Sequence, residues 1–429
     1  MTSSHRPLAL VVETREIDLV DDLLAYTSPA APLAWLRRGD GIVGIGDLGG
    51  YESGPVDARG AARSESPADT WRAIAEAAHV DDPLRLPGTG LVAFGTLVFD
   101  ERSSGTSRLI VPEAIVGRHR GRSWITRIRR EDAPPHDPLP VEPTAYGPYW
   151  SATLGPGTLD PEGYQATVRR AVEAIRAGGL DKVVLARDLV GTIPGGTDLR
   201  RLVRALADDY PDTWTFAVDG LIGASPETLV TASRGVVTAR VLAGTIPRGT
   251  DAHRDTEASA SLSHSAKDLE EHRYAVQSVL DTLGPHVRDL RADPEPFTLK
   301  LPNLWHLATD VAGDLADHAS SLDLVAALHP TAAVAGTPTD AAVELIRRLE
   351  PFDRRRYAGP VGWIDGEGNG EWAIALRCAQ IGPRSDAPAQ GGTIPVVAHA
   401  GAGIVAQSDP DAELLETRVK FRPIVDALA

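Results

Sequence analysis

Segments with strand character and segments with helix character follow one another irregularly after residue 160, and this order restricts the possible fold more than any other feature. Strand patterns continue through 214–246 without a helix between them, and they return near 360–365, 371–381 and 394–399. Helix patterns occur at 160–178, 197–208, 265–283 and 339–349, with a last helix from about residue 410. Because strict strand–helix alternation is missing, we expect a layered α+β fold rather than a doubly wound one.

The first third of the chain has strand signals but no chemical motif. The segments 8–14, 90–99 and 108–117 are rich in Val and Ile and are expected to be strands, and a helix is expected near 67–79. A proline-rich loop follows at 133–148, and a second loop is expected at 383–392. We therefore expect residues 1–150 to be a sheet-forming part of the same body as a catalytic region at 151–429.

Composition excludes several classes of protein. The 43 Lys and Arg residues against 59 Asp and Glu residues give a net charge of −16, which argues against nucleic acid or an anionic membrane as the main partner. The single cysteine, Cys378, excludes a disulfide framework and every multi-cysteine metal site. No run approaches the roughly 18 apolar residues of a membrane span, and the N-terminus is a poor signal peptide. These features predict a cytoplasmic protein.

The last predicted helix carries an acidic pair on one face. Asp409 is expected to cap this helix, and Glu413, Glu416 and Lys420 are spaced by three and four residues, so all three project from one side. Two carboxylates on adjacent turns suit a hard cation such as Mg²⁺. The alternative is an exposed Glu416–Lys420 ion pair with no ligand.

A second acidic pair lies in the helix predicted at 265–283. Asp268 and Glu271 are three residues apart and share a face. Asp268 also stands three residues after Ser265, so it has an alternative role in capping the helix. The sequence does not show whether this pair and the pair on the last helix meet at one Mg²⁺ site.

Three further residues are ionisable side chains within or beside segments predicted to be strands, where such groups are candidates for a functional role. Lys182 begins an apolar strand, where it is either a solvated strand end or a buried general base. Glu227 follows Pro226 at a turn before a strand, where a carboxyl group can serve as a general acid. Arg377 is predicted to be central in an apolar strand, so it requires an anionic partner such as a carboxylate.

A dozen ordered motifs make the chain resemble the chorismate-utilising enzymes, and within them the isochorismate synthases. The resemblance runs in family order from about residue 160 to 425, some 60% of the chain, while the first 150 residues match only in strand pattern. The motifs are KVVLAR (182–187), SPETLV (225–230), LAGTIPRG (242–249), KDLEEH (267–272), WHL (305–307), LHPT (328–331), EPFD (350–353), YAGPVGW (357–363), GNGEW (368–372), RC (377–378), AGAGI (400–404) and ETRVK (416–420).

The resemblance implies a fold, a reaction and a role for each matching residue. The fold is a single large chorismate-binding body of two packed mixed sheets with helices outside. Lys182 is similar to the lysine that activates water for attack at C2 of chorismate, and Glu227 to the acid that protonates the departing C4 hydroxyl. Glu271 and Glu416 match Mg²⁺ ligands, with Asp268 and Glu413 nearby. The substrate-binding positions implied are Gly244, Thr245, His306, Tyr357, Arg377, Gly403 and Lys420.

Position 243 narrows the choice among relatives. Aminodeoxychorismate synthases have a lysine there that attacks C2, whereas this chain has Ala243, which leaves water as the nucleophile. The expected activity is therefore that of a Mg²⁺-dependent isomerase that converts chorismate to isochorismate. The alternatives are a salicylate synthase, which goes on to eliminate pyruvate, and a catalytically silent chorismate-binding protein.

The resemblance also implies what the protein meets in the cell. We expect chorismate as substrate, no obligatory glutaminase subunit and a monomeric state. Isochorismate feeds menaquinone and the catecholate or salicylate siderophores, and the general resemblance favours menaquinone.

Overall fold

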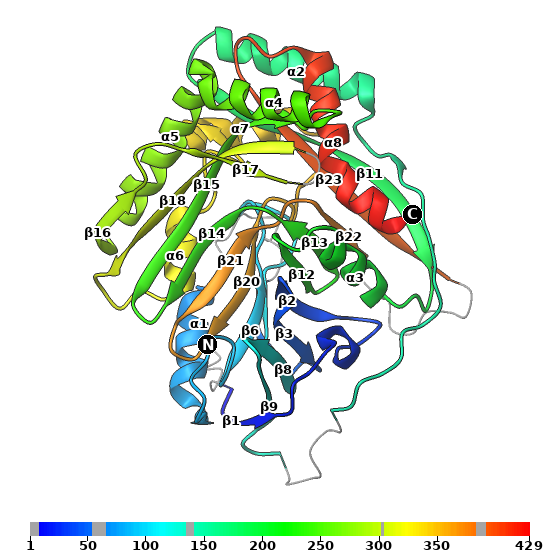
Figure 1. Ribbon diagram of the computed structural model, residues 1–429, viewed down its shortest axis with the longest axis vertical. Coiled ribbons are helices and arrows are strands. Elements are labelled where there is room, and N and C mark those ends of the chain that lie inside the picture. Colours follow the sequence, from blue (N-terminus) through cyan, green and yellow to red (C-terminus); the bar gives the residue numbers. More distant parts are fainter. Residues whose placement is uncertain (1–7, 54–65, 134–140, 302–303, 383–391) are drawn as a thin grey trace, which may run out of the picture.

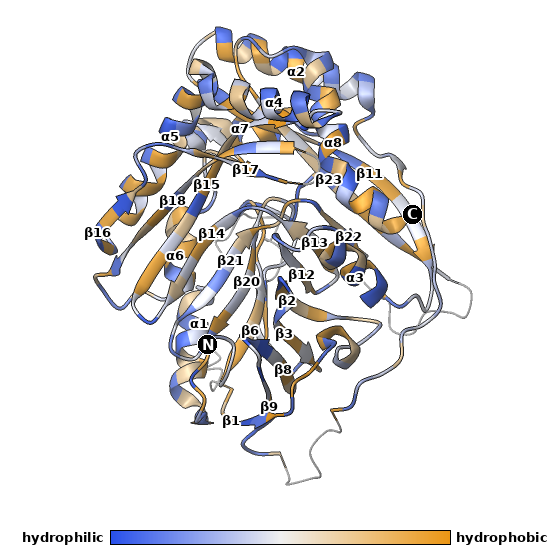
Figure 2. Cartoon of the chain, in the orientation of Figure 1, coloured by the Kyte–Doolittle hydropathy of each residue, from blue (hydrophilic) through white to orange (hydrophobic). Residues whose placement is uncertain are grey.

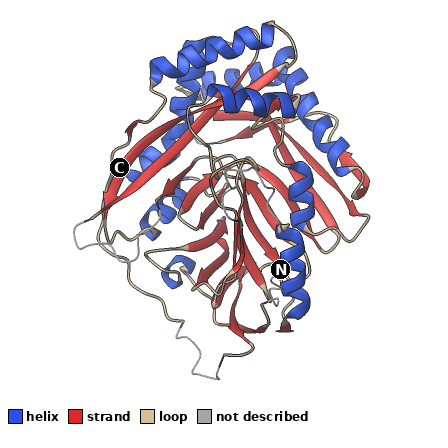
Figure 3. Cartoon of the chain, turned by 180° about the vertical axis from the view of Figure 1, so that it is seen from behind, coloured by secondary structure: helices blue, strands red, loops and turns tan. Residues whose placement is uncertain are grey.

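The computed structural model describes residues 8–53, 66–133, 141–301, 304–382 and 392–429, without the side chains of Lys267 and Glu271. The expected loop at 383–392 thus falls almost wholly outside the described residues. Within them, the chain forms two large sheets with helices packed outside, as Figures 1 and 3 show from opposite sides. This arrangement confirms the predicted α+β fold.

Sheet A contains strands from both halves of the chain. Its strands, in spatial order, are β10 (Gly155–Pro156), β11 (Lys182–Pro194), β23 (Thr393–Ile404), β22 (Cys378–Ile381), β13 (Leu221–Ser225), β12 (Trp214–Val218), β2 (Leu33–Arg37), β3 (Asp40–Ile45), β8 (Ala114–His119), β9 (Arg122–Arg130), β1 (Leu10–Ile17) and β5 (His79–Asp81), with β19 (Gly336–Thr337) also paired to β11. The pair β1–β5 is parallel, which makes sheet A mixed.

Sheet B is antiparallel throughout its described ladders. Its strands, in spatial order, are β16 (Val287–Ala292), β18 (Leu304–Leu315), β15 (Val236–Pro247), β14 (Thr228–Ser233), β21 (Gly370–Ile374), β20 (Pro360–Asp365), β6 (Val92–Thr96), β7 (Arg108–Ile110) and β4 (Gly50–Glu52), with β17 (Phe297–Lys300) also paired to β18. Large side chains such as Trp372 and Phe94 are fully buried in the core that sheet B shares with sheet A.

The helices gather mainly at one end of the molecule, beside the longest strands of both sheets (Figure 1). The α-helices of the described residues are α1 (Pro67–Ala77), α2 (Pro161–Arg176), α3 (Arg200–Asp209), α4 (Ala252–His264), α5 (Ala266–Leu283), α6 (Ser321–Leu328), α7 (Thr339–Leu349) and α8 (Pro410–Leu428). Of these, α1 lies near the opposite end of the molecule (Figure 1). Hydrophobic and hydrophilic residues interleave along α2 and α8 in Figure 2, as expected for helices that cover a sheet with one face. None of the described helices is long and apolar enough to cross a membrane.

Local signals explain where the helices begin. The side chain of Asp160 accepts a hydrogen bond from Gly163 N at the start of α2, and Asp409 caps α8 in the same way through Asp411 N and Ala412 N. Ser265 caps α5 by accepting a hydrogen bond from Asp268 N. After α2, Gly178 and Gly179 have φ angles of +91° and +102°, a region that favours glycine, so the helix ends there as predicted.

Two predicted strands are in fact pairs of strands. The segment 108–117 contains β7 and β8, which belong to different sheets, and 371–381 contains β21 and β22, which also belong to different sheets. The prediction that Arg377 is central in a strand was therefore wrong: it lies between β21 and β22 with a φ of +51°. The helices α4 and α6 were not predicted.

Among the places where the chain passes from one sheet to the other, two are neighbours in space. The chain passes from β13 in sheet A to β14 in sheet B through Pro226 and Glu227, and from β21 in sheet B to β22 in sheet A through Arg377. The two crossings lie side by side, because β13 pairs with β22 and β14 pairs with β21. Glu227 and Arg377 lie outside the strands at these two crossings, so the alternation of side chains within a sheet does not fix the direction in which they point.

Candidate active site

One cavity of about 210 Å³ gathers twelve of the thirteen residues that the sequence singled out. The thirteenth, Glu271, lies on α5, and its side chain is outside the described structure. The twelve that line the cavity are Lys182, Glu227, Gly244, Thr245, Asp268, His306, Tyr357, Arg377, Gly403, Glu413, Glu416 and Lys420. They come from both sheets and from α5 and α8, so only the folded chain brings them together.

Lys182 enters the cavity from the first position of β11. Its strand lies between β19 and β23, with Lys182 opposite Thr337 and Val184 opposite Gly403. The side chain of Lys182 is half-buried. Because β11 is paired on both sides at this point, the position from which the ammonium group extends is fixed by two ladders.

Glu227 is held at the crossing between the sheets by its backbone. Its N–H donates to Ser225 Oγ at 3.2 Å, and its carbonyl accepts from Ile374 N at 3.1 Å. Burial raises the pKa of Glu227 to about 7, against the opposing effect of nearby Lys182, Arg377 and Lys420. A carboxyl group with a pKa near 7 is protonated in a large share of molecules at neutral pH, as a general acid requires.

Arg377 is a buried cation that faces the cavity. The residue is only 8% exposed, and its guanidinium makes no hydrogen bond to any described residue. A buried charge without a partner is costly, so this arrangement favours an anionic ligand. Tyr357 lines the cavity beside it, with its ring stacked on His399 at 5.1 Å between centroids.

A β-bulge in β15 places Thr245 against His306. The register of β15 and β18 shifts between Ala243 and Thr245, where Gly244 has a φ of +79°. After the bulge Thr245 lies opposite His306, and Thr245 Oγ1 is 2.9 Å from His306 Nδ1. Burial lowers the pKa of His306 to about 3, so its ring is neutral at pH 7. Its Nε2 atom is buried without a hydrogen-bond partner among the described residues.

Three carboxylates and one ammonium group line the α5–α8 side of the cavity. Asp268 comes from α5, and Glu413 and Glu416 come from α8. Lys420 Nζ lies 2.5 Å from Glu416 Oε1 and donates to Gly401 O at 3.0 Å, so the ion pair considered from the sequence is present and faces the cavity. Carboxylate oxygens are the donors that Mg²⁺ prefers, so this donor set fits the ion. Among the described side chains no three acidic, His or Cys residues already form a metal cage.

Sequence reasoning missed Arg354, which also lines the cavity. Arg354 forms a buried ion pair with Glu350 and donates hydrogen bonds to the carbonyls of Val184 at 2.7 Å and Val334 at 3.0 Å. Glu350 Oε1 also accepts from Ala186 N at 2.8 Å. The pair therefore fixes β11 just after Lys182. The segment 350–354 follows the end of α7 and is not helical, so the four-residue spacing of Glu350 and Arg354 gave no helix-face signal for the pair.

Comparison with known proteins agrees with this geometry. The family described as chorismate binding enzyme matches residues 148–429. The chain belongs to this family. The isochorismate synthase DhbC of Bacillus subtilis is 40% identical over 63% of this chain and 68% of its own length. The vibriobactin-specific isochorismate synthase of Vibrio cholerae is 36% identical over 62% of this chain and 66% of its own length.

One solved structure is similar to this chorismate-binding enzyme over the whole length of the chain. The menaquinone-specific isochorismate synthase MenF of Escherichia coli superposes with a TM-score of 0.78 over 100% of this chain and 97% of its own. At 23% identity this similarity establishes a shared fold. It includes the strands of the first 150 residues, where sequence motifs are absent.

Proposed function

We propose that this chain is an isochorismate synthase, an isomerase that converts chorismate to isochorismate. The observation that carries the proposal is that Lys182, Glu227 and the unpaired guanidinium of Arg377 line one cavity. The first two supply a base and an acid, and the third supplies a site for a carboxylate. The relatives at 36% and 40% identity are isochorismate synthases by name, which supports this choice within the family.

The acid and the base divide the reaction between them. Lys182 takes a proton from water as the water attacks C2 of chorismate, and Glu227 gives its proton to the C4 hydroxyl, which leaves as water. Ala243 lines the cavity with a methyl group only, so no protein nucleophile stands at that position. The raised pKa of Glu227 supports its role as the proton donor.

The substrate is a dianion and needs cations in a protein whose net charge is −16. Arg377 is suited to bind one carboxylate through its planar fork of N–H groups. We assign Tyr357, Gly403, Lys420 and His306 to the remaining contacts with the carboxylates, and Gly244 with Thr245 to the region of the C4 hydroxyl. All of these residues line the same cavity.

Mg²⁺ is the proposed cofactor. Glu271 and Glu416 would hold the ion, and Asp268 and Glu413 would hold water bound to it; three of these four carboxylates line the cavity. The bound ion would neutralise a substrate carboxylate among these acidic side chains. We further propose that the enzyme acts as a cytoplasmic monomer and needs no glutaminase subunit, since water rather than ammonia is the nucleophile.

The identity of the product tests the proposal. The protein is incubated with chorismate and Mg²⁺, isochorismate is followed by chromatography, and pyruvate is followed with lactate dehydrogenase. We expect isochorismate to accumulate without pyruvate. Pyruvate in amounts equal to the chorismate consumed would identify a salicylate synthase instead, and unchanged chorismate would contradict enzymatic function altogether.

A further inference from the structure

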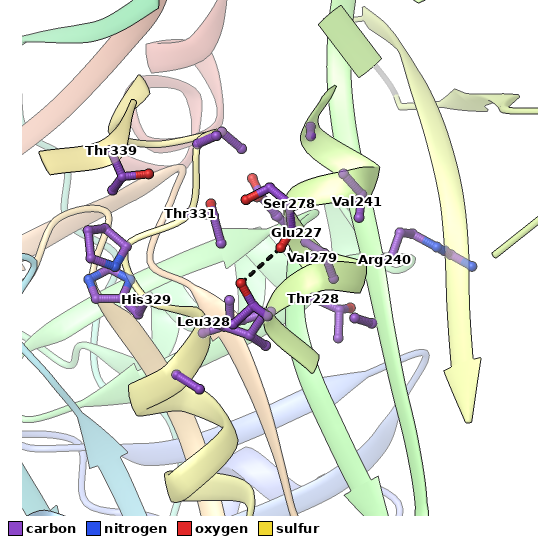
Figure 4. A pocket seen from close by; sticks show the side chains of 18 of the residues that line it. Glu227, Thr228, Arg240, Val241, Ser278, Val279, Leu328, His329, Thr331 and Thr339 are labelled. Atoms are coloured by element: carbon purple, nitrogen blue, oxygen red, sulfur yellow. Dashed lines mark hydrogen bonds between the residues drawn. The ribbon is translucent and has the colours of Figure 1, made fainter. Parts of the chain in front are cut away.

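A second cavity adjoins the candidate active site at Glu227 (Figure 4). This adjoining cavity has a volume of about 270 Å³ and is lined by β14, β15, α5 and the segment 327–340. Figure 4 shows Ser278 and Val279 on its α5 side and His329, Thr331 and Thr339 on the facing segment. Glu227 and Ala333 line both cavities, whereas Lys182 lines only the active-site cavity. Glu227 thus stands in the wall between two spaces.

The inner part of the adjoining cavity has polar groups that need hydrogen-bond partners. Thr331 Oγ1 and His329 Nδ1 are enclosed and make no hydrogen bond to any described residue. Likewise, no described residue donates a hydrogen bond to the carboxyl group of Glu227. Enclosed polar groups in native proteins are nearly always satisfied by protein or by ordered water. The lining combines these polar groups with apolar side chains such as Leu229 and Val279, and a space of about 270 Å³ has room for several water molecules, each of which occupies about 30 Å³ in the liquid.

The outer part of the adjoining cavity reaches solvent. Ser278 on α5 and Asp340 on α7 both line it and are exposed, and Thr282 and Thr339 beside them are half-buried. Hydroxyl and carboxylate groups therefore line the path from the surface to Thr331 and Glu227. Thr282 Oγ1 donates to Ser278 O at 2.8 Å and Thr339 Oγ1 donates to Gly336 O at 3.4 Å. These two hydroxyls can therefore accept hydrogen bonds from water, whereas Thr331 Oγ1 can both donate and accept.

The proposed reaction requires a proton to return to Glu227 after each turnover. Glu227 gives one proton to the departing C4 hydroxyl, and Lys182 takes one from the attacking water, so the cycle consumes no net proton. Both residues must nevertheless be reset. On the active-site side Glu227 faces the bound substrate or product, which separates it from solvent until release.

We propose that the adjoining cavity is a water-filled route that returns a proton from solvent to Glu227. The proton enters between Ser278 and Asp340, passes along water held by the hydroxyls of Thr282, Thr339 and Thr331, and ends on the carboxylate of Glu227. Lys182 releases its proton separately, through the active-site cavity. This inference rests on the proposed function for the role of Glu227 as an acid.

Closing the outer end of the route tests the inference. The variant Ser278→Trp places a large side chain at the exposed opening, and Gln277→Trp, one residue away on the exposed surface of α5 and outside the cavity, is the matched control. We expect Ser278→Trp to lower kcat roughly tenfold with KM unchanged, and to raise the solvent deuterium isotope effect on kcat, because proton return becomes rate-limiting. Thr331→Val, which removes a hydroxyl at constant shape, should act in the same direction.

Other results would overturn the inference. If Ser278→Trp and Thr331→Val both keep the kcat and isotope effect of the control, no proton reaches Glu227 by this route. A lower kcat with an unchanged isotope effect in both variants would also overturn the inference, because proton return would then not limit the rate. Ordered water in the adjoining cavity, seen in a crystal structure of the protein, is independent of turnover: a dry cavity contradicts the inference, whereas a hydrated cavity in a protein that leaves chorismate unchanged contradicts the proposed function.

Discussion

Lys182 and Glu227 have opposite requirements at pH 7, and their substitution separates catalysis from binding. A general acid or base contributes about 10²–10⁴-fold to the rate, so we expect Lys182→Ala and Glu227→Gln each to lower kcat by at least that order. Chorismate binding, measured by calorimetry, should survive in both variants, because Arg377 and Lys420 remain. A nearly unchanged kcat in either variant would show that the substituted residue is not the general acid or base. Loss of binding along with activity would show that the residue serves substrate recognition instead.

The pH dependence of activity should report the pKa of Glu227. Its pKa is raised to about 7 by burial, and Lys182, Arg377 and Lys420 are the charged groups that act on it. Only the protonated form of Glu227 donates a proton, whereas only the neutral form of Lys182 accepts one, so the two residues act in opposite directions on the pH profile of the unsubstituted protein. In Lys182→Ala the residual kcat/KM depends on Glu227 alone and is expected to be constant below pH 7 and to fall tenfold per unit above it. A profile of kcat/KM from pH 5.5 to 9 measures this directly. A level profile up to pH 9 would show that Glu227 is not the proton donor.

Residue type and spacing predicted much of the candidate site. Residues three apart on a helix share one face, so Glu413 and Glu416 could be paired from the sequence alone. In the structure Lys420 lines the same cavity and pairs with Glu416, as expected. The position of Arg377 could not be predicted in this way. Its apolar neighbours indicate a central strand, but the chain leaves one sheet for the other there, which depends on contacts far away in the sequence.

At the scale of elements, α5 and α8 jointly provide the acidic side of the cavity, which is the basis for a prediction about Mg²⁺. Glu416→Gln removes one charged oxygen donor, so we expect calorimetry to show much weaker Mg²⁺ binding and assays to show loss of turnover that added Mg²⁺ partly restores. Glu257→Gln, on the exposed surface of α4, is the control. Full turnover in excess chelator would refute the requirement for the ion.

The buried Glu350–Arg354 pair connects α7 to β11, and it makes a prediction about stability. Their side chains are 1% and 2% exposed, and breaking a buried pair leaves an uncompensated charge. Glu350→Gln is therefore expected to lower the free energy of unfolding by about 3–5 kcal/mol, measured by urea denaturation. The exposed pair Arg72–Asp69 supplies the control, since Asp69→Asn should cost at most about 1 kcal/mol. Equal effects of the two substitutions would contradict this account.

Elements with strong local signals were predictable, and those defined by the sheets were not. The bounds of α2, α5, α7 and β20 follow from caps, glycines and periodic apolar residues, and the structure confirms them within a few residues. The splitting of 108–117 into β7 and β8 has no local signal, because both strands are apolar and differ only in the sheet that they join. Strand pairing is a property of the whole chain, and α4 and α6 pack on strands that pairing brings together.

At the scale of the whole molecule, Glu227 and Arg377 of the candidate site lie where the chain passes from one sheet to the other. The crossings at Glu227 and Arg377 are held side by side by the ladders β13–β22 and β14–β21. Strands from the first 150 residues extend both sheets, although the residues assigned to chemistry all lie beyond position 180. The composition predicted a large globular body, but only the topology explains why an acid and a guanidinium from distant segments face one cavity.

The central claim is that water attacks C2 while the C4 hydroxyl leaves, and one reaction tests it directly. The protein is incubated with chorismate and Mg²⁺ in ¹⁸O-labelled water, and the mixture is followed by proton NMR and mass spectrometry. The account predicts conversion to isochorismate that carries one ¹⁸O atom, at C2. Isochorismate without the label would mean that the original hydroxyl migrates within the substrate, and the absence of isochorismate would contradict the account as a whole.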